Sequence, residues 1–298
     1  MIATTGFFDG VHMGHRVVLQ RVAEVARAQE DESAAITFWP HPRVILHQDS
    51  GKVRLLNTLD EKKQRIQEAG INHIFVLPFT AGFSQLSPED FMKEYLCRRF
   101  QVTTLIVGYD HHLGAHAGAG YEQLRAIGAG INIRVERVEE KRDSVQRLTV
   151  SATKIREALA QGNVDTANRL LGYSYQLQGV VVEGQRIGRQ LGFPTANMQL
   201  YEPLKQLPAN GVYHTRVRLN DAVYCGMTNI GVRPTVQPGD TARTIETHIL
   251  NFSDDIYGQN LSVEFLSRLR DERRFASLDD LKTQLQHDRE QLQIMNYE

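Results

Sequence analysis

The sequence predicts an α/β fold: a doubly wound parallel sheet with helices, followed by a small antiparallel β-barrel domain with a C-terminal helix. Three observations carry this prediction. Short β-branched runs alternate with longer amphipathic stretches from Ile2 to Ile133, as in a parallel sheet with crossover helices. From Gln176 the chain changes to closely spaced strand-like runs broken by glycine and proline, which favours a small barrel or sandwich, and a final amphipathic stretch follows Ser277. We therefore expect two domains, residues 1–172 and residues 176–298.

Five strand-like runs define the first domain: residues 2–5, 33–39, 73–77, 103–107 and 131–135. Helix-like segments cover residues 14–29 and 59–69, and a third helix opens at Ser87, an N-cap serine that precedes a proline and two acids. Doubly wound parallel sheets bind ligands beyond the carboxyl ends of their strands. The motifs GFFDGVHMGH and VGYDHHLGAHAGAG each follow a strand, so we expect both at the binding edge of the sheet.

The second domain follows a helical stretch, residues 151–172, that ends on Gly172. Its strand-like runs are QLQGVVVEG, GVYHTRVRLN, AVYCGMTNIG, TIETHILNF and LSVEFLSRL. Turn signals separate these runs at close spacing, a pattern typical of antiparallel strands. Ser277, with Asp280 three residues later, opens the last helix.

Composition and charge exclude several classes of partner. The 298 residues contain 34 lysines and arginines against 35 acids, a formal net charge of −1, so no global field draws the protein toward nucleic acid or an anionic membrane. No apolar run approaches the roughly 18 residues that a membrane span needs, and we expect a cytoplasmic protein. Cys97 and Cys225 lie among apolar or small neighbours and are expected to be structural thiols. The sequence leaves the oligomeric state open.

The opening motif GFFDGVHMGH predicts an anion site. Gly6 and Gly10 let the backbone approach a ligand, and Gly14 leaves room at the start of the helix. A helix N-terminus presents unpaired N–H groups and a partial positive charge. His12 and His15 are expected on one helix face, where both can donate hydrogen bonds to charge that develops during attack at phosphorus. The alternative for an isolated H-x-G-H is a capping turn with two surface histidines.

Two further segments of the first domain carry polar groups. In SATKIR, Ser151 and Thr153 near a helix start offer hydroxyl donors to phosphate, and Arg156 adds a planar fork suited to oxyanions. Taken alone, the segment is also compatible with an N-capped helix that carries a solvated arginine. In TFWPHP, Trp39 and His41 follow a strand, and the alternative there is a core tryptophan with a histidine in a loop.

The segment GQRIGRQLGFPTAN predicts a phosphate and metal site in the second domain. Gly184 and Gly188 permit a mobile loop over phosphates, which Arg189 can neutralise. In PTAN, Thr195 and Asn197 lie on one side of an extended segment, and two neutral oxygen ligands so placed suit a Mg²⁺ that also takes phosphate oxygens and waters. The alternative to a phosphate and metal site is a glycine-rich hairpin followed by a rigid segment.

An acid in ETHIL is the candidate general base. Glu246 lies on an expected strand with apolar neighbours, a setting compatible with proton abstraction. From these residues alone, Glu246 could equally be an ion-pair partner on the surface of a barrel.

Together these motifs resemble prokaryotic bifunctional riboflavin kinase/FAD synthetases, whose second activity is FMN adenylyltransferase. GFFDGVHMGH is similar to the signature of the nucleotidyltransferase superfamily, and TFWPHP, VGYDHHLG and SATKIR follow in the order of that family. GQRIGRQLGFPTAN, GVY, TNIGVRPT, ETHIL, DDIYG and FLSRLRDERRFASLDDL resemble the riboflavin kinase module, also in order. The resemblance covers nearly all of the chain.

The resemblance implies two reactions and their substrates. The second domain would phosphorylate riboflavin to FMN with ATP, giving ADP, and the first would transfer AMP from a second ATP to FMN, giving FAD and pyrophosphate. Mg²⁺ is implied at both sites, with ATP as co-substrate. In the first domain the implied catalytic residues are His12 and His15, and His41 would line the flavin phosphate. The implied ATP contacts there are Gly6, Phe8, Asp9, Gly10, Gly14, Asp110, Ser151, Thr153 and Arg156.

In the second domain the resemblance implies that Glu246 accepts the proton of the ribityl 5′-hydroxyl. ATP would be bound by Gly184, Gly188 and Arg189, and the metal by Thr195 and Asn197. Arg270 and Phe275, near the last helix, are expected flavin contacts.

Departures from the family pattern lie in the first domain. Leu113 stands where the family commonly has phenylalanine, only His116 offers a basic group in the segment that follows, and Ala152 replaces the usual second serine of a hydroxyl pair. Two alternative functions therefore stay open. One is a nucleotidyltransferase for another phosphorylated metabolite. The other is a riboflavin kinase whose N-terminal half has become a weak or inactive module that binds nucleotide or flavin. In its extreme form the whole chain would be a non-catalytic regulator that binds flavin or nucleotide.

Overall fold

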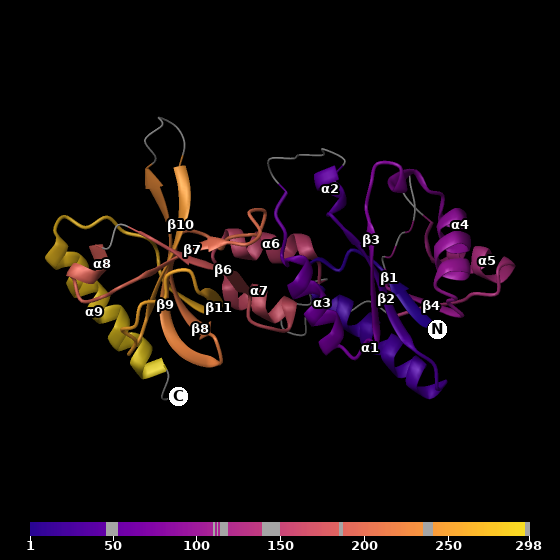
Figure 1. Ribbon diagram of the computed structural model, residues 1–298, viewed down its shortest axis with the longest axis horizontal. Coiled ribbons are helices and arrows are strands. Elements are labelled where there is room, and N and C mark those ends of the chain that lie inside the picture. The colour runs from indigo at the N-terminus through magenta and orange to yellow at the C-terminus, as the bar shows by residue number, and fades with distance from the viewer. Residues whose placement is uncertain are drawn as a thin grey trace. The chain divides into compact units, whose positions relative to one another are not determined.

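The computed structural model describes residues 1–45, 53–109, 111, 113, 119–138, 150–184, 187–234 and 241–295. The chain divides into two compact units, Met1–Ala152 and Thr153–Glu298, which we describe separately (Figure 1). The helices between Ala152 and Leu171 group with the second unit. The domain boundaries expected from the sequence, 1–172 and 176–298, stay a prediction. No helix in the described part of the chain is long and apolar enough to cross a membrane.

The first unit contains the predicted parallel sheet. Its strands are β1 (Ile2–Thr5), β2 (Ser33–Trp39), β3 (His73–Pro78), β4 (Thr104–Val107) and β5 (Arg134–Arg137), in the order β3-β2-β1-β4-β5. The connection reverses direction between β1 and β4, so the carboxyl ends of these two strands border the topological switch point of the sheet. The two motifs expected at the binding edge follow these two strands, β1 and β4.

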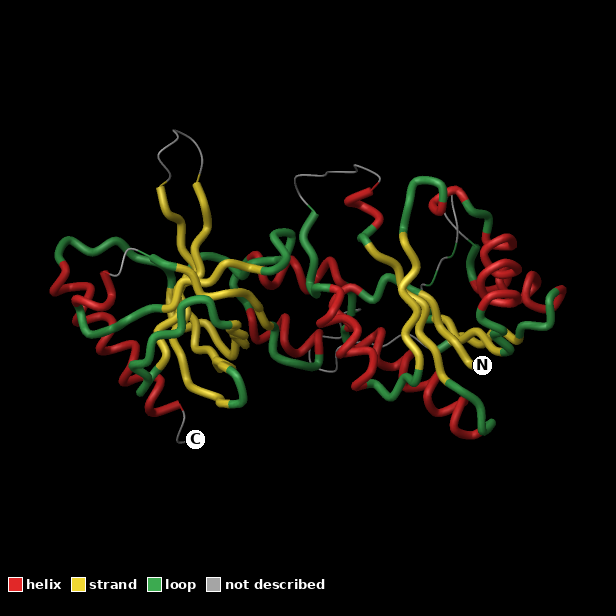
Figure 2. Tube along the Cα trace, viewed as in Figure 1, coloured by secondary structure: helices red, strands yellow, loops and turns green. Residues whose placement is uncertain are grey.

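Helices cover both faces of this sheet, which confirms the doubly wound class (Figure 2). On one face, α1 (Met13–Ala28) and α3 (Leu59–Glu68) bury Val18, Leu19 and Ile66 against Ile2 and Ile106. The other face is covered by α4 (Pro88–Asp90), its continuation as the π-helix η3 (Phe91–Arg99), and α5 (Tyr121–Gly130). Short helical turns complete the unit: η1 (Asp9–Val11), α2 (Pro42–Ile45) and η2 (Phe83–Gln85).

Local signals set most element boundaries in the first unit. Ser87 caps its helix as predicted, because its side chain accepts a hydrogen bond from the backbone N–H of Asp90. The last strand begins at Arg134, three residues later than expected. The reason is that Ile131 ends α5 and Asn132 takes a left-handed conformation, with φ of 58°, before the chain extends.

The second unit is a closed antiparallel barrel, one of the two architectures that the sequence favoured. Its strands run in the order β10-β7-β6-β11-β8-β9. They are β6 (Gln176–Val182), β7 (Ala196–Leu200), β8 (Gly211–Leu219), β9 (Ala222–Pro234), β10 (Thr241–Ile249) and β11 (Asn260–Arg270). Strand β7 was not among the expected strand runs, and it carries Asn197. The short helix α8 (Ile187–Gln190) precedes it.

Three helices pack on this barrel. The helical stretch expected over 151–172 is two helices, α6 (Ala152–Ala160) and α7 (Val164–Leu171), because Gly162 breaks it with φ of 77°. α7 ends at Gly172, whose N–H bonds to the carbonyl of Asn168. The last helix, α9 (Leu278–Met295), follows Ser277 as predicted, since the Ser277 side chain accepts from the N–H of Asp280 at 3.1 Å.

Candidate active sites

The turn after β1 has a fixed and strained shape. Phe8, Gly10 and Val11 all have positive φ, at 48°, 80° and 37°. Glycine adopts this conformation readily, whereas Phe8 and Val11 hold it only because the core buries them completely or nearly so. The Phe8 ring also lies against Gly6, where an added Cβ would come within 3.2 Å of the ring. Glycine at position 6 thus leaves room for the Phe8 ring, and the close approach of a ligand to this turn stays a prediction.

His12 is the N-cap of α1, whereas the sequence analysis expected both histidines on one helix face. Its Nδ1 accepts a hydrogen bond from the backbone N–H of His15 at 3.3 Å, so the ring proton lies on Nε2, which can donate. The His12 and His15 rings stack with centroids 3.7 Å apart. A Cβ on Gly14 would lie 3.2 Å from His12 Nδ1, so glycine at this position leaves room for the stacked ring.

His15 is electrically neutral and presents a buried nitrogen. Burial lowers its pKa well below 6.5, and electrostatic interactions with His12, Lys62 and His111 lower it further. Its Nδ1 is buried and makes no hydrogen bond with any residue that the structure describes. The pair lies at the N-terminus of α1, beside the switch point of the sheet. This arrangement suits an anion, because both the helix end and the imidazole N–H groups favour negative charge.

Asp9 has a structural role that the sequence analysis missed. Its carboxylate is buried, and Oδ1 accepts hydrogen bonds from the backbone N–H groups of Leu56 at 2.9 Å and Asn57 at 3.4 Å. The side chain thus ties the β1–α1 turn to the segment before α3. The ATP contact expected for Asp9 stays a prediction. No local signal could have revealed a partner 47 residues away.

The remaining candidates of the first domain are dispersed. His41 is partly buried, with its ring 5.8 Å from that of Phe7. Ser151 is partly buried at the end of the first unit. Thr153 and Arg156 lie on α6, which groups with the second unit, so their contact with a triphosphate held at α1 stays a prediction.

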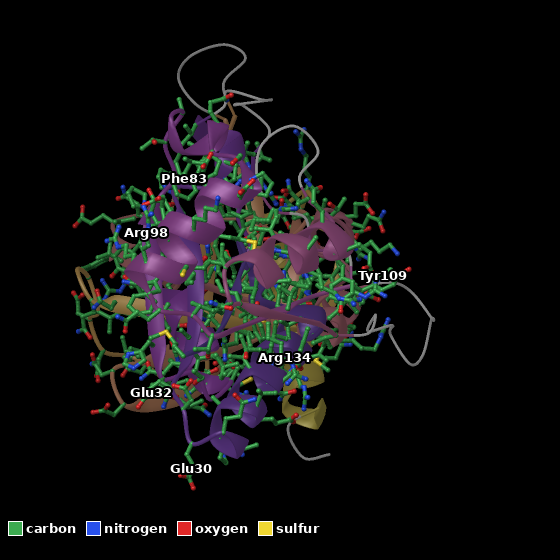
Figure 3. All side chains as sticks on the ribbon, turned by 90° about the vertical axis from the view of Figure 1, so that its right-hand side faces the viewer. Glu30, Glu32, Phe83, Arg98, Tyr109 and Arg134 are labelled. Atoms are coloured by element: carbon green, nitrogen blue, oxygen red, sulfur yellow. The ribbon has the colours of Figure 1, made fainter. Side chains whose placement is uncertain are left out.

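The motif after β4 is only partly described. Asp110 lies outside the described residues. Tyr109 is 57% exposed at the periphery of the unit (Figure 3), and the Arg137 guanidinium lies 5.7 Å from its ring centroid. Leu113, the departure from the family pattern, is buried in the core and pairs with Ala119 across an isolated bridge. Leucine therefore fills a packing position here.

In the barrel, the structure brings the candidate base and a candidate metal ligand together. Glu246 on β10 is the direct register partner of Asn197 on β7, and of Asn229 on its other neighbour β9. Directly opposed residues share one face of a sheet. The next residue, Thr247, is fully buried and its hydroxyl lies 2.9 Å from that of Thr228 inside the barrel, so the Glu246 face is the outer one.

Close backbone approach shapes the loop beside this pair. A Cβ on Gly184 would lie 2.2 Å from the Asn197 side-chain nitrogen, and a Cβ on Gly188 would lie 2.3 Å from the carbonyl oxygen of Phe193. Thr195 and Asn197 are both partly buried, and Arg189 is exposed on α8. Because residue 184 is a glycine, the Asn197 side chain has room to lie on the strand face that it shares with Glu246. The neutral oxygens of Thr195 and Asn197 would suit a Mg²⁺ that also binds phosphate.

His248 positions this segment and was missed by the sequence analysis. It lies two residues after Glu246 on β10, and its Nδ1 donates to the carbonyl oxygen of Pro194 at 2.8 Å. Its pKa is lowered, chiefly by burial and also by the charge of Arg289, against the opposing effect of the Pro194 bond. A neutral, buried imidazole thus fixes the residue before Thr195. The sequence did contain a sign of this role: residues two apart on a strand share a face, so His248 could be placed on the same face as Glu246.

Arg270 and Phe275, the expected flavin contacts, lie beside α9. The Arg270 guanidinium makes a buried ion pair with Asp288 of α9, with Nη2 to Oδ2 at 2.7 Å and Nε within 3.0 Å of both oxygens. Gln284 donates to the same carboxylate at 2.8 Å. The Phe275 ring centroid is 5.9 Å from Arg270. Arg270 therefore fixes α9 on the barrel, and the flavin contact stays a prediction.

We expect Gly184→Ala to lower kcat/KM for phosphorylation at the Glu246 site by at least about tenfold, because the added methyl must displace the Asn197 amide. Steady-state rates with MgATP measure this. Gly130→Ala is the control, since its methyl would meet nothing within 4 Å. Normal kinetics for Gly184→Ala would show that the position of the Asn197 amide does not matter.

Comparisons with known proteins identify the family to which this chain belongs. The sequence profile of FAD synthetase matches residues 1–154, and that of riboflavin kinase matches residues 171–295. A crystal structure of a protein from Streptococcus pneumoniae, described as a macrolide-efflux protein, has a TM-score of 0.87 and 29% identity, covering 97% of this chain and 92% of that one. This likeness confirms the fold.

Curated relatives extend over nearly the whole chain. Bifunctional riboflavin kinase/FMN adenylyltransferases are 37% identical in Pseudomonas fluorescens, 34% in Escherichia coli K12 and 33% in Listeria monocytogenes. Each alignment covers 96% of this chain and 90% of the relative. The first unit has a histidine pair at the switch point of its parallel sheet, and the barrel has an acid beside PTAN, as both sequence motifs predict. Because of these features and the curated relatives, the chain belongs to the family of bifunctional riboflavin kinase/FMN adenylyltransferases.

Proposed function

We propose that this chain converts riboflavin to FAD in two steps, each in its own unit. Phosphorylation of riboflavin takes place on the barrel, and the register of Glu246 against Asn197 is the observation that supports it most directly. Adenylylation of FMN takes place at the switch point of the parallel sheet. The stacked His12 and His15 at the N-terminus of α1 support that assignment.

In the kinase step, the Glu246 carboxylate takes the proton of the ribityl 5′-hydroxyl. The hydroxyl oxygen forms a bond to the γ-phosphorus of ATP while the bond from that phosphorus to the β,γ-bridging oxygen breaks, giving FMN and ADP. Gly184 leaves room for the Asn197 amide and Gly188 for the carbonyl group of Phe193. We assign the phosphates of ATP to the backbone of this loop and to the positive charge of Arg189. His248 holds Pro194, and so Thr195, in place.

In the adenylyl step, a phosphate oxygen of FMN attacks the α-phosphorus of a second ATP. The bond to the α,β-bridging oxygen breaks and pyrophosphate leaves, so no protein group needs to take a proton. His12 donates from Nε2, and His15 and the first N–H groups of α1 add donors for charge on the transferred group. Within the first unit we assign Ser151 to the leaving pyrophosphate and His41 to the flavin phosphate, and the same role for Thr153 and Arg156 stays an expectation from the family resemblance.

Mg²⁺ completes the kinase site in this proposal. Thr195 and Asn197 would hold it, and when bound it neutralises charge on the ATP phosphates. The adenylyl site is expected to use Mg²⁺ as well. We further propose that the protein works in the cytoplasm without a nucleic-acid or membrane partner, which its net charge of −1 supports.

A flavin assay tests this function directly. Full-length protein with riboflavin and MgATP is expected to form FMN first and FAD afterwards, as resolved by chromatography. Protein given FMN and MgATP is expected to form FAD and pyrophosphate in equal amounts. A product from neither flavin would contradict both assignments, and FMN without FAD would leave only the kinase.

A further inference from the structure

Lys62 is a buried cation that the two-step mechanism above does not use. It lies in the first turns of α3 and is only 3% exposed. Its Nζ lies 5.4 Å from the ring centroid of Trp39, the last residue of β2. It makes no hydrogen bond, and no ion pair within 4 Å, with any residue in the described part of the chain. Asp9 attracts it only through longer-range electrostatics.

The neighbouring residue Lys63 shows how unusual the burial of Lys62 is. Lys63, the next residue, is 44% exposed at its side chain and forms an ordinary surface ion pair with Asp60 at 3.5 Å. A buried ammonium without a close partner is costly, because burial removes its hydration and no hydrogen-bonded anion replaces it. An apolar side chain of similar length would fill the same space at no such cost. A ligand that brings negative charge to Lys62 would offset this cost.

The surroundings of Lys62 place that ligand at the histidine site. The charge of Lys62 acts directly on His15, where it helps to lower the pKa of the imidazole. Asp9 fixes the segment before α3, through Leu56 and Asn57, to the turn that ends at His12. Lys62 thus reaches the anion site from a second helix, 47 residues beyond His15 in the sequence.

We propose that Lys62 is a phosphate-binding residue of the adenylyltransferase site, without an ion-pair partner among the described residues of the free protein and paired with a phosphate oxygen of ATP or FMN in the complex. The proposal rests on the adenylyltransferase function proposed above. It adds a flexible point charge to the turn of His12 and His15, whose own donors are imidazole and backbone N–H groups. Such a charge can follow the phosphate as negative charge shifts during transfer.

The protonation of Lys62 supports this role and sets its pH dependence. Burial lowers the pKa of Lys62 from 10.5 to about 8, against the attraction of Asp9. The ammonium form therefore exists in the free protein below about pH 8 and is lost above it. The unfolded chain keeps this proton up to about pH 10.5, so the folded state gains stability as pH rises between these two values. At neutral pH the charge destabilises the ligand-free protein.

The test replaces Lys62 with Met in the full chain and uses Lys63→Met as the matched control. We expect Lys62→Met to lower kcat/KM for FAD formation from supplied FMN by about 10-fold to 100-fold, the range for losing one charged hydrogen bond. Separate titrations of ATP and FMN show which phosphate is held, because the KM of that substrate rises. Riboflavin phosphorylation is expected to stay at the wild-type rate.

Two further readouts distinguish substrate binding from a structural role. Lys62→Met is expected to raise the Tm of the ligand-free protein. Wild type is expected to lose kcat/KM above about pH 8, and Lys62→Met is expected to lack this pH dependence. Lys62→Arg is expected to recover part of the lost activity. Wild-type FAD formation in Lys62→Met, or a clearly lowered Tm with lost activity, would overturn the proposal. If wild type itself makes no FAD, calorimetric titrations with ATP and with FMN still decide: a Kd for one of them that is about 10-fold to 100-fold higher in Lys62→Met supports the proposal, and unchanged Kd values for both overturn it.

Discussion

Glu246→Gln is expected to lower the rate of FMN formation by about 10³-fold and to leave the conversion of supplied FMN to FAD unchanged. Glutamine has the size and shape of glutamate, so the packing against Asn197 and Asn229 is kept. What it lacks is a carboxylate that can take the proton of the attacking hydroxyl. The loss is therefore confined to the reaction in which an alcohol is the nucleophile.

Chromatographic time courses started from riboflavin and from FMN measure the two reactions separately. Glu290→Gln, an exposed residue of α9, serves as the matched control and should keep both rates. Equal loss of both activities in Glu246→Gln would contradict the division of labour between the two units.

His15→Phe is expected to give the opposite pattern, with FAD formation from FMN lowered about 10²-fold to 10³-fold and riboflavin phosphorylation unchanged. Phenylalanine keeps the stack on His12 and the edge contact with Phe8, at centroid distances of 3.7 and 5.3 Å in the native ring. It removes both ring nitrogens. The comparison therefore isolates the polar contribution of His15 from its packing.

The pH profile sharpens this prediction. Because the pKa of His15 lies well below 6.5, the imidazole is already neutral at pH 7, and the effect of His15→Phe should be the same across the neutral range. His73→Phe, an exposed histidine that faces Glu32, is the control. A loss that appears only in mildly acidic solution would instead show that the imidazolium is the working form.

Much of the fold follows from local pattern. β1 and β2 have the predicted bounds because their apolar, β-branched residues stop at clear turn signals, and the caps at Ser87 and Ser277 mark helix starts in the sequence itself. Errors arise where backbone conformation interrupts a continuous pattern. The left-handed Asn132 delays β5, and Gly162 divides one apparent helix into two. Strand β7 was missed because proline and glycine precede it.

The sequence predicted which motifs carry the candidate site residues, but it did not predict the contacts that hold those residues in place. The signatures place the histidines, PTAN and the acid in the right units, because each signature is contiguous. Contacts between distant segments leave no such trace. Asp9 bonds to the backbone of Leu56, His248 holds Pro194, and Arg270 is occupied by Asp288. Each of these needs the folded chain, since the partner lies 18 to 54 residues away.

The hydroxyl groups of Thr215, Thr228 and Thr247 form a buried chain across three neighbouring strands, with successive oxygens 2.9 Å apart. This chain favours the register that keeps Glu246 on the outer face of the barrel. A strand that slipped by one residue would exchange its two faces, bringing Glu246 inside and turning Thr247 outward. The misaligned barrel would then enclose a charge and break the hydroxyl chain, two penalties that favour the native alignment. These buried threonines thus help to keep the candidate base Glu246 on the outer face of the barrel.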